Sequence, residues 1–179
     1  MRKPLLLVAV SAALAASTAG ADDKIHARLI GFQEVPAVST QATGTFEAVI
    51  SPNGNAIDYE ITYTGMQGTV TQSHVHVGQR SVNGGVVLWV CGTALNVPNV
   101  TNTPGPAGTP TCTSPNGHFA GTWRPENVQT VVAQQFAPGE LDEVIAAIRA
   151  GFAYANVHTL ISQGGEIRGQ IRANRRDRD

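Results

Sequence analysis

Hydrophobic and polar residues alternate along most of the chain, which is the pattern of strands that bury one face. The clearest run is 57–63, where isoleucines and tyrosines share one face and acidic residues and a threonine share the other. An Asn-Gly turn at 53–54 precedes it, and residues 43–50 before the turn alternate in the same way. These two segments predict an antiparallel hairpin.

Similar runs predict strands over most of the remaining chain. They cover residues 25–32, 69–77, 86–91, 118–123, 128–136, 152–159 and 166–172. Clusters of Gly, Pro, Asn and Ser separate them at short intervals. No segment repeats with a period of about 20–50 residues, which excludes a solenoid. The pattern predicts a mainly β protein, an antiparallel β-sandwich or Greek-key barrel.

One segment, 140–150, has the period of a helix instead. Its apolar residues recur at the spacing of one helix face: Leu141, Val144, Ile145 and Ile148. Acidic residues in its first turn and Arg149 in its last suit the helix dipole, and Gly151 is placed to end it. We expect a short amphipathic helix that is held by packing against the sheet.

The first 21 residues have the pattern of a secretory signal peptide. Arg2 and Lys3 precede an apolar run over 5–14, and Ala19–Ala21 is a small-residue cleavage pattern. The apolar run is too short to cross a bilayer as a helix. We expect cleavage after Ala21 and export to the periplasm or the medium.

Composition limits the partners of the remaining chain, which we treat as one domain over residues 22–179. Its core covers about 25–171, and a charged tail covers 173–179. In the full sequence only 14% of the residues are charged, against about 25% in average proteins, and the net charge is −1. Without a basic surface nucleic acid is excluded as a partner, and no later run could span a membrane. The partner class that remains is a protein or a surface.

The two cysteines, Cys91 and Cys112, are predicted to form a disulfide. An isolated pair in an exported protein is usually bonded, and no Cys-x-x-Cys spacing favours a metal site. The bond would close the Pro- and Gly-rich segment 92–111, which cannot hold a regular strand ladder. We assign that segment no further role.

Three histidines are the best candidates for a metal site. His74 and His76 are two residues apart on a predicted strand, which places both imidazoles on one face. His158 lies near the end of another predicted strand. Two imidazoles from one strand and one from a neighbour make a three-nitrogen site that suits copper or zinc. The alternative is that these histidines are structural and only hydrogen-bonded.

Other polar residues are weaker candidates. His26 and His118 lie near strand starts and carry no such spacing. Glu166 and Arg168 share one face of the last predicted strand, which favours a structural carboxylate–guanidinium pair over an acid and an electrophile. As a further alternative, Glu166 orients an imidazole, and Asn156 shares the strand face of His158.

The motifs of common enzymes are absent from the sequence. It contains no Gly-x-Ser-x-Gly, no phosphate-binding loop between strand and helix, and no His-Glu-x-x-His. This favours a binding or structural module over an enzyme, and it implies no cofactor beyond the copper or zinc of the histidine hypothesis.

Three motifs resemble the CHRD domain, which is named after chordin. They are the segment LIGFQEVP at 29–36, HVHVG at 74–78, and the stretch 151–171 that contains YANVHT and GEIRGQI. The resemblance covers about residues 25–171. It implies an extracytoplasmic domain that in chordin belongs to a protein binding secreted growth factors, and it implies no enzymatic activity.

The His-Val-His strand and the later Val-His strand also resemble Cu/Zn superoxide dismutase, a Greek-key sandwich. The expected fold is therefore immunoglobulin-like or dismutase-like. The chain lacks the zinc loop rich in His and Asp and has no counterpart of the bridging histidine. The resemblance therefore does not extend to dismutase activity.

Overall fold

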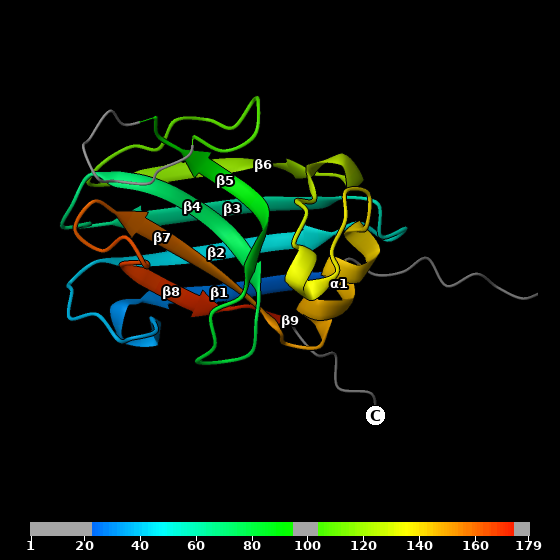
Figure 1. Ribbon diagram of the computed structural model, residues 1–179, viewed down its shortest axis with the longest axis horizontal. Helices are drawn as coiled ribbons and strands as arrows, with labels where there is room; N and C mark the ends of the chain where they lie inside the picture. Colours follow the sequence, from blue (N-terminus) through cyan, green and yellow to red (C-terminus); the bar gives the residue numbers. More distant parts are fainter. Residues whose placement is uncertain (1–22, 95–103, 174–179) are drawn as a thin grey trace, which may run out of the picture.

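A computed structural model shows one antiparallel sheet that curves into a nearly closed barrel (Figure 1). The structure describes residues 23–94 and 104–173. The expected signal peptide at 1–21 and the tail from 174 onward lie outside the described residues, as does 95–103 in the Pro- and Gly-rich segment.

Within the described residues, nine strands form the sheet. They are β1 (Asp23–Ile30), β2 (Thr43–Ile50), β3 (Ile57–Thr64), β4 (Val70–Val77), β5 (Gly85–Gly92), β6 (Gly117–Trp123), β7 (Ala153–Thr159), β8 (Ile167–Gln170) and β9 (Arg172–Ala173). Their order is β5-β4-β7-β8-β1-β2-β3-β6, and β9 pairs with β1 beside β8. The edge strands β5 and β6 approach one another where the indole Nε1 of Trp123 donates to the carbonyl of Trp89 at 2.8 Å. The mainly β architecture predicted from the sequence is confirmed.

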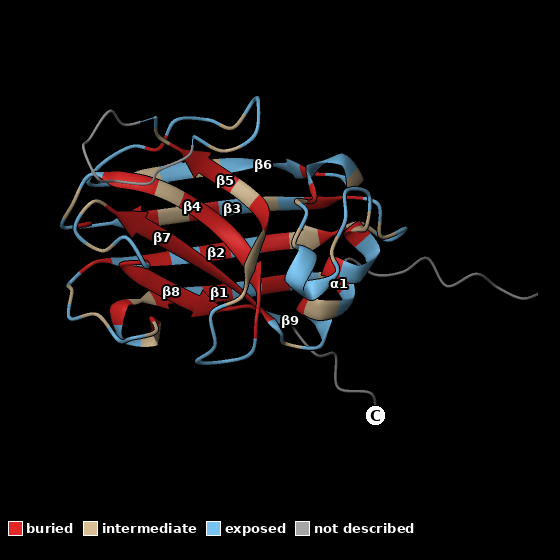
Figure 2. Ribbon diagram, viewed as in Figure 1, coloured by how far each residue is buried: buried red, intermediate tan, exposed pale blue. Residues whose placement is uncertain are grey.

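The two halves of the sheet differ in how they are covered (Figure 2). In β1 and β2 buried and exposed residues alternate, so one face lines the core and the other meets solvent. Nearly all residues of β4, and all of β7, are buried. Their apolar side chains, Val75 and Val157 among them, join the core. Their polar side chains lie on the opposite face and contact the segments that follow each strand, at Gly84 and Gln163.

The predicted strand over 128–136 is wrong. Residues 131–136 turn back on themselves, and Val131 and Phe136 exchange both backbone hydrogen bonds. A 3-10 turn at Val132–Gln134 and a left-handed Gln135 close this turn. The backbone groups are thus satisfied locally, and Val132, which the pattern counted as a strand residue, is 82% exposed.

The first and last predicted strands also differ from the observed ones in where they end. β1 stops at Ile30, because Gly31 begins a 3-10 turn and its carbonyl accepts hydrogen bonds from Glu34 and Val38. The segment predicted over 166–172 is divided: β8 pairs with β7 and then β9 pairs with β1. Ile171 lies between them and donates its amide to Ala153 at 2.9 Å.

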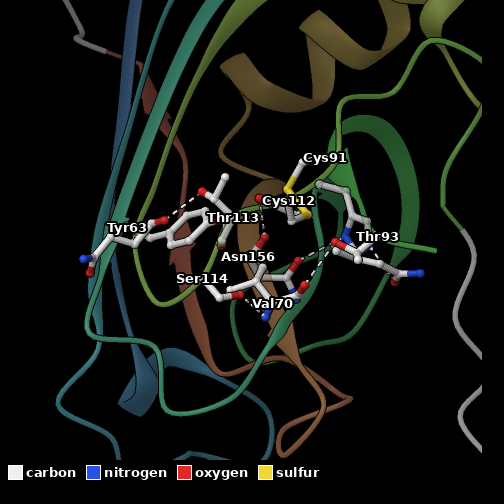
Figure 3. The surroundings of a disulfide bond; sticks show 12 residues. Tyr63, Val70, Cys91, Thr93, Cys112, Thr113, Ser114 and Asn156 are labelled. Atoms are coloured by element: carbon white, nitrogen blue, oxygen red, sulfur yellow. Dashed lines mark hydrogen bonds between the residues drawn. A yellow bond between two sulfur atoms is a disulfide. The ribbon is translucent and has the colours of Figure 1, made fainter. Parts of the chain in front are cut away.

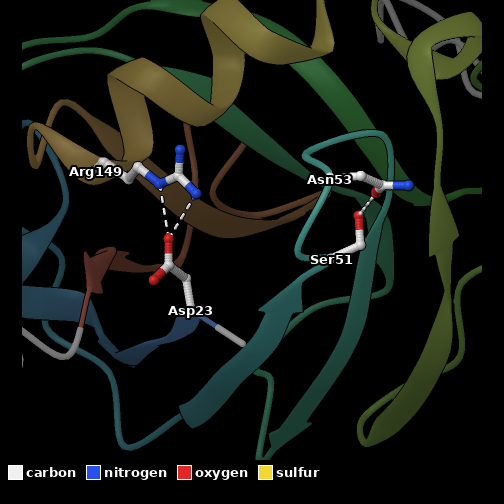
Figure 4. A network of polar contacts seen from close by, with 4 residues as sticks. All are labelled: Asp23, Ser51, Asn53 and Arg149. Atoms are coloured by element: carbon white, nitrogen blue, oxygen red, sulfur yellow. Dashed lines mark hydrogen bonds and ion pairs between the residues drawn. The ribbon is translucent and has the colours of Figure 1, made fainter. Parts of the chain in front are cut away.

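The predicted helix is confirmed as α1 (Leu141–Arg149), which packs its apolar face on the barrel. The buried residues of α1 are the four predicted ones, Leu141, Val144, Ile145 and Ile148. Gly151 follows with a positive φ of 81°, as expected for a helix-ending glycine. Arg149 forms an ion pair with Asp23 at the start of β1 (Figure 4). No helix within 23–94 and 104–173 is long and apolar enough to cross a membrane.

Cys91 and Cys112 are bonded, as predicted, with their Cα atoms 5.0 Å apart (Figure 3). The segment after Cys112 is then attached to two strands. The hydroxyl of Tyr63 in β3 donates to the carbonyl of Thr113 at 2.7 Å, and the amide of Val70 in β4 donates to Ser114 Oγ at 2.7 Å. The disulfide therefore holds the returning chain against the barrel.

Candidate metal centre

Strand register brings the three candidate histidines together on one face. His74 of β4 is opposite Asn156 of β7, and Asn156 is opposite Arg168 of β8. One row further, His76 is opposite Tyr154. Residues that are opposite each other across strands point to the same side of a sheet, so β4 and β7 direct their polar side chains into one cluster.

The histidine cluster consists of His74, His76 and His158. One candidate ligand atom from each imidazole lies within 4.8 Å of the other two. His74 Nδ1 and His76 Nε2 are 2.9 Å apart, and the ring centres of His74 and His158 are 4.6 Å apart. The three side chains are buried, with exposed fractions of 2%, 7% and 8%. The three imidazoles therefore lie together on one face, as the spacing in the sequence predicts.

Each imidazole has one nitrogen turned away from the cluster and toward an oxygen. His76 Nδ1 lies 2.8 Å from the carbonyl of Gly84, and His158 Nδ1 lies 2.8 Å from that of Gln163. His74 Nε2 lies 3.2 Å from Oε1 of Gln72. A carbonyl oxygen only accepts, so the nitrogen facing it carries the proton. The other nitrogen of each neutral ring then presents a lone pair to the cluster, as in metal-bound histidines.

The inward nitrogens are not fully satisfied. His158 Nε2 is buried and has no hydrogen-bond partner among the described residues. His74 Nδ1 and His76 Nε2 face one another, and a single proton between them is the most they can share. A cation at the centre of the cluster would satisfy all three lone pairs.

Burial lowers the pKa of all three imidazoles. The pKa of His74 falls well below its ordinary value because of burial first and the neighbouring His158 and His76 second. Burial lowers the pKa of His76 to about 4, although its bond to Gly84 opposes the shift. Burial also lowers the pKa of His158. All three rings are neutral at pH 7, which is the form that binds a metal.

Aromatic rings hold two of the imidazoles in place. Tyr154 stacks on His76 with ring centres 4.6 Å apart and planes 5° apart, and the guanidinium of Arg168 lies 3.4 Å above Tyr154. Trp89 meets His74 edge-on at 4.8 Å. These contacts restrict ring rotation and leave the inward nitrogens facing one another.

Asn156 is part of the same cluster. Its Oδ1 atom lies 3.1 Å from His76 Nε2 and 3.3 Å from His74 Nδ1. Its backbone carbonyl accepts a hydrogen bond from Ser73 Oγ at 3.0 Å, which ties β7 to β4 at this position. The side chain assigned from the sequence to the face of His158 thus contacts the other two histidines.

Glu166 and Arg168 do not form the expected pair, because each has other partners. The carboxylate of Glu166 accepts hydrogen bonds from Thr40 Oγ1, Thr159 Oγ1 and the amide of Gln67. Glu166 therefore links three segments of the chain. None of these hydrogen bonds involves an imidazole.

Arg168 holds the segment that follows β4. Its guanidinium donates to the carbonyls of Gln79 and Val82 and to Asn83 Oδ1, at 2.9 to 3.2 Å. The same segment supplies the Gly84 carbonyl to His76. Arg168 therefore has a structural role: it fixes the segment 79–84, which supplies a hydrogen-bond acceptor to His76.

Sequence reasoning missed Glu34, a carboxylate that is only 5% exposed. Burial raises its pKa to about 7, while the charge of Arg168 and hydrogen bonds from Val35 and Asn156 oppose the shift. Its Oε1 has no hydrogen-bond partner among the described residues. Glu34 belongs to the Glu-Val-Pro motif, but its position depends on the turn after β1, which no periodicity predicts.

The two weaker histidines lie apart from the cluster. His26 is on the exposed face of β1, opposite Glu47 of β2. His118, on β6, lies 3.0 Å from Glu60 at the surface. Neither belongs to the group of candidate ligands that the described residues form.

The fold and the cluster together define an antiparallel β-barrel module with a buried cluster of three histidines outside its core. The chain belongs to the CHRD domain family: the family model matches residues 25–171, nearly its whole length. Searches of curated proteins and of solved structures find no match to it.

Proposed function

We propose that this CHRD domain is an exported binding module that holds a copper or zinc ion at His74, His76 and His158. One observation carries the proposal. Each imidazole directs one nitrogen to an oxygen acceptor and the other toward the two neighbouring imidazoles, where His158 Nε2 is buried without a partner among the described residues. Hydrogen-bonded structural histidines would have no need of this convergence.

The donor chemistry favours copper or zinc over other metals. Imidazole nitrogens suit both ions, whereas magnesium and calcium prefer oxygen-rich sites. The cluster offers no thiolate, because both cysteines are bonded to each other. Metal–nitrogen bonds of about 2.0–2.1 Å require only small movements of imidazoles whose ligand atoms already lie within 4.8 Å of each other.

Membership of the family supports a second function, a module that binds a protein or surface partner without metal. The absence of catalytic motifs favours both functions over an enzyme. The signal-peptide pattern at 1–21 and the disulfide support export, since disulfides persist in oxidising compartments.

The test is metal titration of the chain from residue 22 onward, purified with its disulfide intact and stripped with a chelator. We expect one equivalent of copper or zinc to bind with micromolar or tighter affinity at pH 7. His74→Ala and His158→Ala each abolish that binding, whereas His26→Ala, which changes a surface histidine, leaves it intact.

Two results would reject the metal function. One is the absence of binding at micromolar concentrations by the wild-type protein. The other is unchanged binding by the double variant His74→Ala/His76→Ala. Either result would leave the metal-free binding module as the function.

A further inference from the structure

The side-chain oxygen of Asn156 lies in the histidine cluster without a hydrogen-bond donor, because the imidazole protons are on the outward nitrogens. Its Oδ1 lies 3.1 Å from Nε2 of His76, whose proton is on Nδ1 facing the carbonyl of Gly84. An oxygen acceptor next to a lone pair forms no hydrogen bond. The same oxygen lies 3.3 Å from His74 Nδ1.

These distances are those between neighbouring ligands of a tetrahedral ion. With metal–ligand bonds of about 2.0–2.1 Å, donor atoms at tetrahedral angles are about 3.3 Å apart. Asn156 Oδ1, His74 Nδ1 and His76 Nε2 form a triangle with sides of 2.9, 3.1 and 3.3 Å. They match one face of a coordination tetrahedron, and His158 Nε2 completes the set from the same strand as Asn156.

We propose that Asn156 Oδ1 is the fourth ligand and that the centre is closed, with three nitrogens, one oxygen and no open position. This inference rests on the metal function proposed above and specifies its chemistry. Sites with four protein ligands hold an ion for structure or carriage, whereas hydrolytic sites keep a position for water. The module therefore carries a metal and does not activate water on it.

Strand pairing fixes the backbone of Asn156, and a hydrogen bond to Glu34 orients its side-chain amide. Its backbone lies between β4 and β8 and is paired on both sides. Its carbonyl accepts from Ser73 Oγ, and its side chain hydrogen-bonds to the buried Glu34. Since Glu34 takes the amide nitrogen, the amide oxygen faces the histidines. Glu34 is thus a positioning residue for the fourth ligand.

The test compares Asn156→Leu and Asn156→Asp with the wild type and with Ser73→Ala. The Ser73 variant is a matched control, because it removes a hydrogen bond to the backbone carbonyl of Asn156, which strand pairing also holds, and leaves every proposed ligand atom in place. Zinc affinity is measured by competition with a coloured chelator. The visible spectrum of the Co²⁺-loaded protein, with and without azide, reports whether a position is open.

We expect Asn156→Leu to weaken zinc binding about tenfold to a hundredfold and to make the cobalt spectrum sensitive to azide. Asn156→Asp keeps an oxygen ligand, so it binds at least as tightly as the wild type and stays insensitive to azide. Ser73→Ala keeps the wild-type spectrum.

The outcomes separate this inference from the metal function. If the wild type binds no zinc or cobalt, the metal function itself fails. If the wild type binds metal but responds to azide, or if Asn156→Leu binds as tightly with the same spectrum, the centre has three ligands and the inference is overturned. If Asn156→Leu does not fold, the Asn156→Asp variant provides the test. A cobalt spectrum identical to that of the wild type would show that residue 156 does not bind the metal, and this would overturn the inference.

Discussion

His158 has two nitrogens in opposite situations. Nδ1 donates to Gln163, while Nε2 is buried without a partner among the described residues. An unsatisfied buried polar atom costs about 1–3 kcal/mol. The protein bears that cost at His158, and the proposed ion would relieve it.

The buried histidines make the stability of the metal-free protein depend on pH. The pKa of His76 is lowered from 6.5 to about 4 in the folded state, so the unfolded chain binds more protons between these values. Stability is therefore lost as the pH falls from about 6.5 toward 4. His76 alone contributes up to about 3 kcal/mol, and the pKa shifts of His74 and His158 act in the same direction.

Urea unfolding of the Glu34→Gln variant in the presence of a chelator, at pH 7, 6 and 5, measures this loss without the opposing titration of Glu34. A free energy of unfolding that is constant across this range would show that the imidazoles are not buried in neutral form.

Glu34 has the opposite effect on stability. Its pKa is raised from 4.5 to about 7, so its contribution is present below 4.5 and is lost as the pH rises through 7. We expect Glu34→Gln to be more stable than the wild type at pH 8, because a neutral amide replaces a buried carboxylate. Denaturant unfolding at pH 5 and pH 8 checks this, and an equal effect at both pH values would contradict it.

Gly165 has no room for a side chain, because it lies against Glu34. It has a φ of +124°, and a Cβ there would overlap the carboxylate of Glu34. Gly165→Ala is expected to cost about 1–3 kcal/mol through the strained backbone, with the overlap adding to it. Gly164→Ala is the matched control, because no atom lies within 4 Å of a Cβ at that position. Equal unfolding free energies for the two variants would disprove the expectation.

At the scale of elements, alternation of residue types predicted the strands with one solvent face well. β2 has the predicted bounds, and β3 is one residue longer than predicted. The pattern failed for 128–136, where apolar residues lie in a self-closed turn, and at the β8–β9 junction, where the chain changes partner. Alternation describes the faces of a segment and contains no information on which neighbour supplies its hydrogen bonds.

For the candidate site, too, the sequence predicted the positions on strands but not those in loops. The spacing of His74 and His76 and the polar face of His158 were readable, because side-chain direction in strands follows from sequence number. The acceptors at Gly84 and Gln163, and the carboxylate of Glu34, lie in loops whose paths depend on the complete fold. The burial of the cluster was not predicted for the same reason.

Helix α1 depends on its packing against the barrel. Ile145 is 2% exposed and lies in the middle of the buried face of α1. We expect Ile145→Ala to lower the free energy of unfolding by about 2–5 kcal/mol, as for other cavities in packed cores. Ala146→Gly, on the exposed face of the same helix, tests helix propensity alone and should cost about 1 kcal/mol. A loss of less than 0.5 kcal/mol for Ile145→Ala, against the expected range, would place this face in solvent.

At the scale of the whole molecule, the disulfide joins segments 21 residues apart. On the chain-entropy model, it stabilises the fold by about 3 kcal/mol. We expect the double variant Cys91→Ser/Cys112→Ser to lose about that much in denaturant unfolding. Titration of the unreduced, denatured wild type should find no free thiol, and two thiols per chain would contradict the bond.

The pairing of β4 with β7 also determines when the histidine cluster exists during folding. His74 and Asn156 are 82 residues apart in the chain, and α1 and the disulfide-bonded segment lie between them. Contacts of such long separation form late, because the entropy of closing the intervening loop must be overcome first. A partly synthesised or partly folded chain presents at most the His-Val-His pair. If the proposed metal function holds, tight metal binding belongs to the fully folded molecule alone. The time at which binding begins in a refolding experiment would then mark the pairing of β7 with β4.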